Sequence, residues 1–171
     1  FDSLGDGYFY LGDYTQAENS KIYAVSLDAT MDWPYLTLAD IAILRADYGE
    51  AEKCLNAYRK LAAYPKAQAD ALAKRAFIRL LEDEPDAALA LLADALRLHD
   101  SASIHDHSAQ SRWLAGLCHV ARGDLAAARR ELGWLQALCG AYRLGEDNFD
   151  PALKFSLHLE ARLAEAERRP K

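Results

Sequence analysis

The sequence contains 171 residues, of which 51% are hydrophobic, and its formal net charge is −6. This length suits one ordinary domain or about four or five repeats of about 34 residues, and no segment approaches the ~18 uninterrupted apolar residues of a membrane span. The overall acidity argues against nucleic acid as the main partner, because phosphate binding depends on clustered positive charge.

The first two repeats carry the same helical pattern. In the first, over about residues 1–30, an Asp-Tyr pair and two further residues precede Ala17 on an apolar helix. The second, over about residues 33–64, places the same pattern before Ala51, 34 residues later. Since aspartate is a preferred residue for capping the start of a helix, each repeat is expected to be a helix, a turn and a second helix.

The third and fourth repeats are longer and less regular. The third, over about residues 66–99, has its alanine at Ala88, and the fourth, over about residues 104–140, has it at Ala128. The interval between these alanines therefore grows from 34 to 37 to 40 residues. Pro85, with acidic neighbours, predicts the start of a helix, although the exact register of the third repeat stays open.

A last helix is expected over about residues 151–168, beginning at Pro151 and bearing Leu153, Leu157 and Leu163. A terminal helix with one polar face would cap the array and keep it soluble. The same segment could equally be the first half of a further repeat.

The first repeat also contains the spacing Phe1-x-x-Leu4-Gly5-x-x-Tyr8. With Phe in place of Trp, it resembles the tetratricopeptide repeat (TPR) family, whose pattern is Trp-x-x-Leu-Gly-x-x-Tyr. The resemblance covers almost the whole chain and is weakest in the third repeat. It implies an all-α fold: a right-handed α-solenoid of about four helix-turn-helix repeats with a C-terminal capping helix, forming a single array over residues 1–171.

In this family the first helices of the repeats line a concave groove that accepts a peptide or helix of a partner protein. Carried over by position, the resemblance implies a groove formed by Asp6, Phe9, Tyr10, Trp33, Leu36, Asp40, Leu44, Arg75, Arg79, Trp113 and Leu117. Trp113 could instead pack between repeats.

Charged residues of the first two repeats set the expected ligand chemistry and mark one departure from the family pattern. Asp6 and Asp40 stand where groove positions that clamp an acidic chaperone tail have Asn, so we expect a ligand with basic and apolar side chains. Lys21 departs from the family, which has a large apolar side chain at that position.

Residue types associated with metal binding or catalysis occur, but their spacing is unfavourable. His99, His105 and His107 could ligate zinc, yet the last two are two positions apart and would diverge on a helix. The adjacent Cys118 and His119 diverge by about 100° and cannot easily activate one another. No phosphate-binding or nucleophile motif is present. The sequence therefore predicts no enzyme activity, no cofactor and no metal.

The leading interpretation is a non-catalytic scaffold for protein–protein interaction. An alternative, favoured by the lengthening period, is a regulatory or sensor module of a larger bacterial transcription or signalling protein. A third is self-association through the ends of the array.

Three widely spaced cysteines, Cys54, Cys118 and Cys139, predict free thiols and a cytoplasmic location. The chain begins at Phe1 inside an expected helix, so we expect a fragment, and a signal peptide upstream of it would not be seen.

Overall fold

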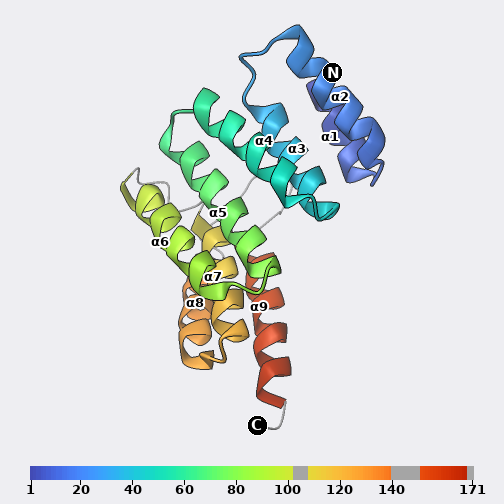
Figure 1. Ribbon diagram of the computed structural model, residues 1–171. Helices are drawn as coiled ribbons and strands as arrows, with labels where there is room; N and C mark the ends of the chain where they lie inside the picture. Colours follow the sequence, from blue (N-terminus) through green and yellow to red (C-terminus); the bar gives the residue numbers. More distant parts are fainter. Residues whose placement is uncertain (102–107, 140–150, 169–171) are drawn as a thin grey trace. The chain divides into compact units, whose positions relative to one another are not determined.

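The computed structural model describes residues 1–101, 108–139 and 151–168, and all regular secondary structure in these ranges is helical (Figure 1). The predicted all-α class is confirmed. The helices are α1 (Asp2–Tyr10), α2 (Tyr14–Leu27), α3 (Trp33–Leu44), α4 (Tyr48–Leu61), α5 (Pro65–Leu81), α6 (Pro85–Ser101), α7 (Ala109–Ala121), α8 (Leu125–Leu138) and α9 (Pro151–Arg168).

The chain divides into two compact parts, Phe1–Ala71 and Leu72–Lys171, with the division inside α5. In the N-terminal part, α1 packs against α2, α2 against α3, and α3 against α4. In the C-terminal part, α6 packs against α7, α7 against α8, and α9 against both α7 and α8. Packing between successive helices is typical of helical-repeat proteins. None of the helices in the described ranges combines the length and apolarity needed to cross a bilayer.

The turns between paired helices share one backbone geometry, which accounts for the repeated sequence. Each contains a residue with positive φ five positions before the alanine of the repeat: 80° at Gly12, 57° at Ala46, 61° at Asp83 and 75° at Gly123. In each turn the next residue donates its backbone N–H to the carbonyl five residues back, as in a Schellman motif. Asp83 thus aligns the third repeat with the others and resolves the register that the sequence left open.

The aspartate of the repeated turn caps the second helix of the pair. The side chains of Asp13, Asp47 and Asp124 accept the backbone N–H of the residue three positions on, at 3.1, 3.0 and 3.0 Å. These contacts satisfy one of the unpaired N–H groups at each helix start. The predicted capping role is confirmed for these three residues.

The alanines that define the period, Ala17, Ala51, Ala88 and Ala128, are fully buried. Twelve positions before each lies another small buried residue: Gly5, Ala39, Ala76 and Gly116. At the two glycines a neighbouring side chain comes close to the backbone. A Cβ at Gly5 would lie 2.9 Å from Cε of Lys21 in α2, and one at Gly116 would lie 2.4 Å from Cδ2 of Leu159 in α9.

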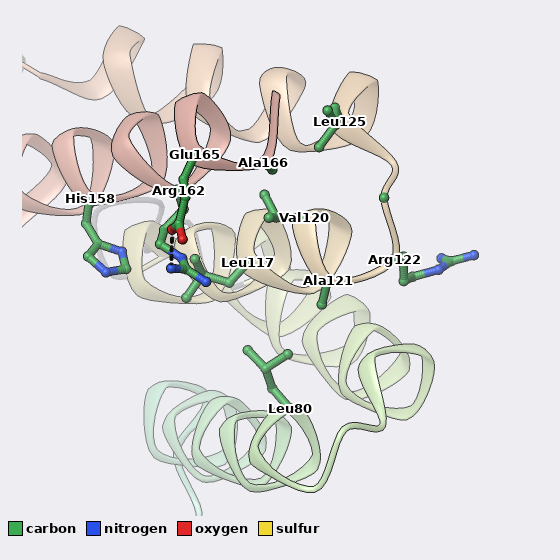
Figure 2. A pocket seen from close by; sticks show the side chains of 11 residues that line it. Leu80, Leu117, Val120, Ala121, Arg122, Leu125, His158, Arg162, Glu165 and Ala166 are labelled. Carbon is green, nitrogen blue, oxygen red and sulfur yellow. Dashed lines mark hydrogen bonds and ion pairs between the residues drawn. The ribbon is translucent and has the colours of Figure 1, made fainter. Parts of the chain in front are cut away.

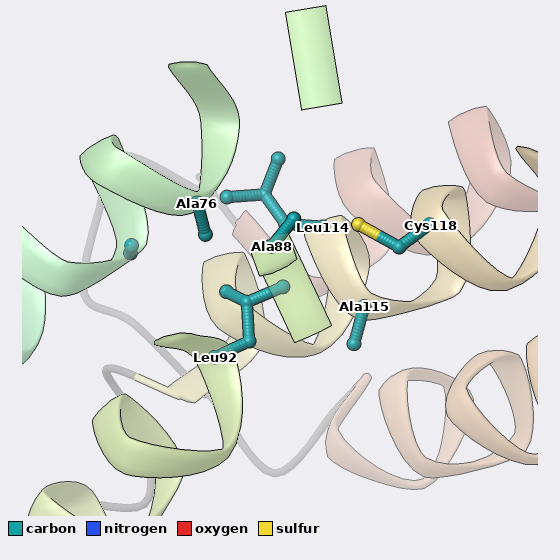
Figure 3. Close-up of a cluster of buried hydrophobic side chains, with 7 residues drawn as sticks. Ala76, Ala88, Leu92, Leu114, Ala115 and Cys118 are labelled. Atoms are coloured by element: carbon teal, nitrogen blue, oxygen red, sulfur yellow. The ribbon is translucent and has the colours of Figure 1, made fainter. Parts of the chain in front are cut away.

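A core of small and medium apolar side chains joins α5, α6 and α7 in the C-terminal part (Figure 3). Its buried members are Ala73, Ala76, Ala88, Leu92, Leu114, Ala115 and Cys118. A second core of that part joins α7, α8 and α9 and is built on Ala109, Ala128, Leu135, Ala152, Leu159 and Leu163. Because alanine has a small side chain, the helix backbones in both cores can approach each other closely.

The leucines of the last helix divide between its buried and exposed faces. Leu163 is buried, whereas Leu153 and Leu157 are 48% and 58% exposed. The buried face consists of Ala152, Ser156, Leu159 and Leu163, at helical spacings of three and four. α9 packs against α8, as α3 packs against α2 and α7 packs against α6.

Candidate functional site

Six of the predicted groove residues line one cavity in the N-terminal part, between α1 and α3. We call it the N-terminal cavity, and its volume is about 220 Å³. Its lining consists of Asp6, Phe9 and Tyr10 from α1, and Trp33, Leu36, Thr37 and Asp40 from α3. Spacings of three and four residues place each set on one face of its helix, which brings the two sets together. Thr37 is the lining residue that the sequence argument missed.

Aromatic side chains form the exposed wall of the N-terminal cavity. Tyr10 is 87% exposed and Trp33 is 43% exposed, although both are large and apolar. Phe9 lies between Tyr10 and Tyr14, with ring centroids 6.2 and 5.5 Å away. The Nζ atom of Lys66 lies 5.6 Å from the centroid of the Trp33 ring, so this ring already receives a cation on its face.

A buried lysine holds the acidic side of this cavity. Lys21 has no exposed surface, and its Nζ atom donates to Oδ1 of Asp6 at 2.5 Å and to Oδ1 of Asp2 at 2.6 Å. It also donates to the Asp2 carbonyl at 3.0 Å. The aliphatic stem of Lys21 passes beside Gly5 and fills the space of a large apolar side chain. This explains the departure from the family pattern at Lys21.

The Lys21 cluster carries more negative than positive charge. Two carboxylates, from Asp2 and Asp6, face one ammonium group, and both retain partial exposure at 23% and 35%. Oδ1 of Asp6 also accepts a long 3.5 Å hydrogen bond from the Thr37 hydroxyl. Lys21 and Thr37 both donate to Oδ1 of Asp6 and so fix the orientation of its carboxylate. This carboxylate also lines the cavity. Asp2 and Asp6 are four residues apart in the sequence, but their pairing with Lys21 depends on the packing of α1 against α2.

A larger cavity lies in the C-terminal part, and Figure 2 shows its lining. We call it the C-terminal cavity, and its volume is about 630 Å³. The lining residues are Leu80, Leu117, Val120, Ala121, Arg122, Gly123, Leu125, His158, Arg162, Glu165 and Ala166. Leu117 is the one member of the predicted set among them. The contribution of α9 was missed because it depends on the packing of α9 against α7 and α8.

Trp113 packs between α7 and α9. Its ring stacks on Phe155 with centroids 5.0 Å apart and planes 21° apart. Its Nε1–H donates to Nδ1 of His158 at 2.9 Å. Of the two interpretations of Trp113, these contacts favour packing between helices, and the residue lines neither of the two cavities.

Three other predicted residues also lie outside the lining of both cavities. Leu44 is 57% exposed at the end of α3. Arg79 pairs with Glu82 at 2.7 Å and with Glu84 at 3.5 Å, beside the turn that joins α5 to α6. Arg75 is half-buried on α5. A binding role for these three residues stays a prediction.

No protein-family model and no curated protein matches the sequence. The fold does match a solved structure. It is that of PilW, described as a widely conserved type IV pilus biogenesis factor, with a TM-score of 0.66. The match covers 99% of this chain and 77% of PilW at 16% sequence identity. At that identity the likeness shows the fold alone, so the predicted helical-repeat architecture is confirmed and TPR membership stays a resemblance.

Of the residues considered for catalysis and metal binding, Cys118 and His99 are buried, His119 is half-buried, and the others lie outside the described ranges. Burial raises the pKa of the Cys118 thiol to about 11, so its thiolate form is scarce near neutral pH. His99 is buried on α6, whereas His105 and His107 lie outside the described residues. Within the described ranges no three candidate ligands gather closely enough to hold a metal ion.

Proposed function

We propose that this chain is a non-catalytic protein-interaction module whose N-terminal cavity binds a partner polypeptide through a basic side chain with apolar neighbours. The proposal rests on one observation. The carboxylates of Asp6 and Asp40 line the same cavity as the exposed aromatic rings of Tyr10 and Trp33. Exposed aromatic groups beside oriented charges are typical of recognition surfaces.

The size of the cavity supports a polypeptide side chain as the ligand. Pockets for whole small molecules usually measure about 300–1,000 Å³, and the N-terminal cavity measures about 220 Å³. It is open to solvent along the aromatic wall, where Tyr10 projects. A single arginine or lysine inserted from an extended chain matches this size, while its neighbours contact the surrounding apolar surface.

The electrostatics of the cavity support a cation. The lining contains two acidic residues and no basic one. The cluster of Lys21, Asp2 and Asp6 has one negative charge in excess, and a ligand cation would balance it. The aliphatic stem of an arginine or lysine would pack on the ring of Trp33 or Tyr10, as long cationic side chains do on apolar surfaces.

The likeness to PilW supports the helical-repeat part of this proposal alone. PilW is described as a type IV pilus biogenesis factor. We propose neither that role nor a pilus partner for this chain. Helical-repeat folds use extended surfaces for binding, and the ligand is set by the side chains on them.

The test uses the whole chain and a fluorescein-labelled Leu-Arg-Leu peptide in a fluorescence anisotropy titration. Asp6→Asn is expected to weaken binding roughly tenfold or more, because a charge-assisted hydrogen bond is lost. Glu50→Gln is the matched control, because it removes a carboxylate of α4 that pairs with Lys53 and does not line the cavity. Equal losses in both variants, or equal affinity for Leu-Glu-Leu, would contradict the proposal.

A further inference from the structure

We propose that the C-terminal cavity is a second, separate binding site, which takes a segment of a partner polypeptide that combines aliphatic and acidic side chains. This inference does not rest on the N-terminal cavity. It rests on the apolar floor of the C-terminal cavity and on the polar donors around it.

The floor of the cavity is aliphatic and comes from three helices. Leu80 of α5, Leu117 and Val120 of α7, and Leu125 of α8 line it, and all four are half-buried. Each packs partly against the core and leaves the remainder of its surface toward the cavity (Figure 2). A volume of about 630 Å³ can hold several side chains of a ligand. Contact with aliphatic side chains would remove this surface from water.

Two arginines at the cavity are held only by weak pairs. Arg122 is 43% exposed and lies 3.1 Å from the carboxylate of Asp86, which is 80% exposed. Arg162 pairs with Glu165 at 2.6 Å, and both side chains are 48% exposed. Ion pairs this exposed contribute little to stability. A ligand carboxylate can therefore replace these partners at little cost.

His158 adds a directed hydrogen-bond donor. Its Nδ1 atom accepts the Trp113 N–H at 2.9 Å, so in the neutral ring the hydrogen lies on Nε2. No described residue accepts a hydrogen bond from that Nε2 atom. The lining thus offers two guanidinium groups and an imidazole N–H against one carboxylate, Glu165, while Asp86, outside the lining, pairs with Arg122.

The positions of these donors favour a polypeptide over a ligand with one charged head group. Figure 2 shows His158 and Arg162 on α9 at one end of the aliphatic row and Arg122, beside the α7–α8 turn, at the other, with the Arg122 side chain extended away from the row. A fatty acid could use one end only. A chain with acidic residues on both sides of aliphatic ones can use both ends together.

The experiment is an anisotropy titration of the whole chain with a fluorescein-labelled Glu-Leu-Leu-Glu peptide. Arg162→Gln and Arg122→Gln are each expected to weaken binding about fivefold or more, because each removes a charged donor. Arg129→Gln is the matched control: Arg129 pairs with Glu167 at 2.6 Å and does not line the cavity. Its effect is expected to stay below about twofold.

Other outcomes would overturn the inference. These are equal binding of Lys-Leu-Leu-Lys, equal losses in Arg129→Gln and Arg162→Gln, or no saturable binding of Glu-Leu-Leu-Glu at millimolar concentration. Saturable binding of decanoate without binding of the peptide would assign the cavity to a fatty acid instead. Circular dichroism of each variant checks that an affinity loss does not come from unfolding.

Discussion

The N-terminal and C-terminal cavities use the same positions of the repeat for opposite chemistry. Asp6, Phe9 and Tyr10 lie 11, 8 and 7 residues before Ala17, and Leu117, Val120 and Ala121 lie 11, 8 and 7 residues before Ala128. One set lines an acidic, aromatic cavity and the other an aliphatic cavity with arginines. The backbone repeat thus places the cavities, and the side chains at these positions determine what each can bind.

The same contrast extends into the core. Four residues after the period-defining alanines the chain has Lys21, Leu55, Leu92 and Leu132. Lys21 pairs with Asp6, whereas in the fourth repeat Leu132 and Leu117 occupy the equivalent positions. In the second repeat Asp40 stands at the position of Asp6 while Leu55 fills the buried position, so the lysine–aspartate pair is particular to the first repeat. The acidic cavity is part of how the first repeat folds as well as of what it is proposed to bind.

The largest expected effect comes from breaking this charged pair. Lys21→Ala should lower the free energy of unfolding by about 3 kcal/mol, because it leaves two carboxylates without their cation and removes a buried stem. The double variant Asp6→Leu with Lys21→Leu, which copies the fourth repeat, should recover all but about 1 kcal/mol of this loss. Urea denaturation measures both. A loss below about 1 kcal/mol in Lys21→Ala would show that the cluster contributes little.

The reaction rates of buried thiols compare how tightly the two parts are packed. Burial raises the pKa of Cys54, in the N-terminal part, and of Cys118, in the C-terminal part, from 9.0 to about 11. Near pH 8 each should react with a disulfide reagent roughly a hundredfold more slowly than in urea, because thiolate is the reactive form. Cys54→Ala and Cys118→Ala assign the two slow phases. A fast reaction of either thiol would show that its part opens readily.

Adding one methyl group at the two small glycines should have unequal effects. At Gly116 the new Cβ would meet the branched end of Leu159 at 2.4 Å, so Gly116→Ala should cost about 2 kcal/mol. At Gly5 it would meet the unbranched stem of Lys21 at the longer distance of 2.9 Å, and alanine favours helix, so Gly5→Ala should change stability by less than about 1 kcal/mol. Thermal unfolding compares them. Equal losses would contradict the difference between the two packing arrangements.

The smallest effects are expected in the turns. Ala46 and Asp83 adopt φ of 57° and 61°, where glycine is less strained, so Ala46→Gly and Asp83→Gly should gain about 0.5 kcal/mol each. Gly12→Ala and Gly123→Ala should lose about 1 kcal/mol. Chemical denaturation resolves the opposite signs. A loss of stability in all four variants would contradict the backbone strain inferred at Ala46 and Asp83.

Local features of the fold could be predicted from the sequence because their causes are local. Asp13, Asp47 and Asp124 cap helices through a residue three positions away, and the helical spacing of the first two repeats brought six cavity residues together. Features that depend on distant partners could not be predicted.

The lysine cluster and α9 illustrate such distant partners. Lys21 reaches Asp2 across 19 residues, and Trp113 reaches His158 across 45. The buried face of α9 follows Gly116, and hydrophobicity alone pointed instead to Leu153 and Leu157. The C-terminal cavity was missed because its lining depends on where α9 packs.

The central claim is that the two cavities, one acidic and aromatic and the other aliphatic with arginines, bind different peptides. It is tested most directly by nitrogen-15 NMR of the indole groups of the three tryptophans, assigned by substitution. Leu-Arg-Leu should shift the signal of Trp33, which lines the N-terminal cavity, and Glu-Leu-Leu-Glu should shift that of Trp113, whose N–H contacts His158. Shifts of the same tryptophan by both peptides, or of neither tryptophan by its own peptide, would contradict the account.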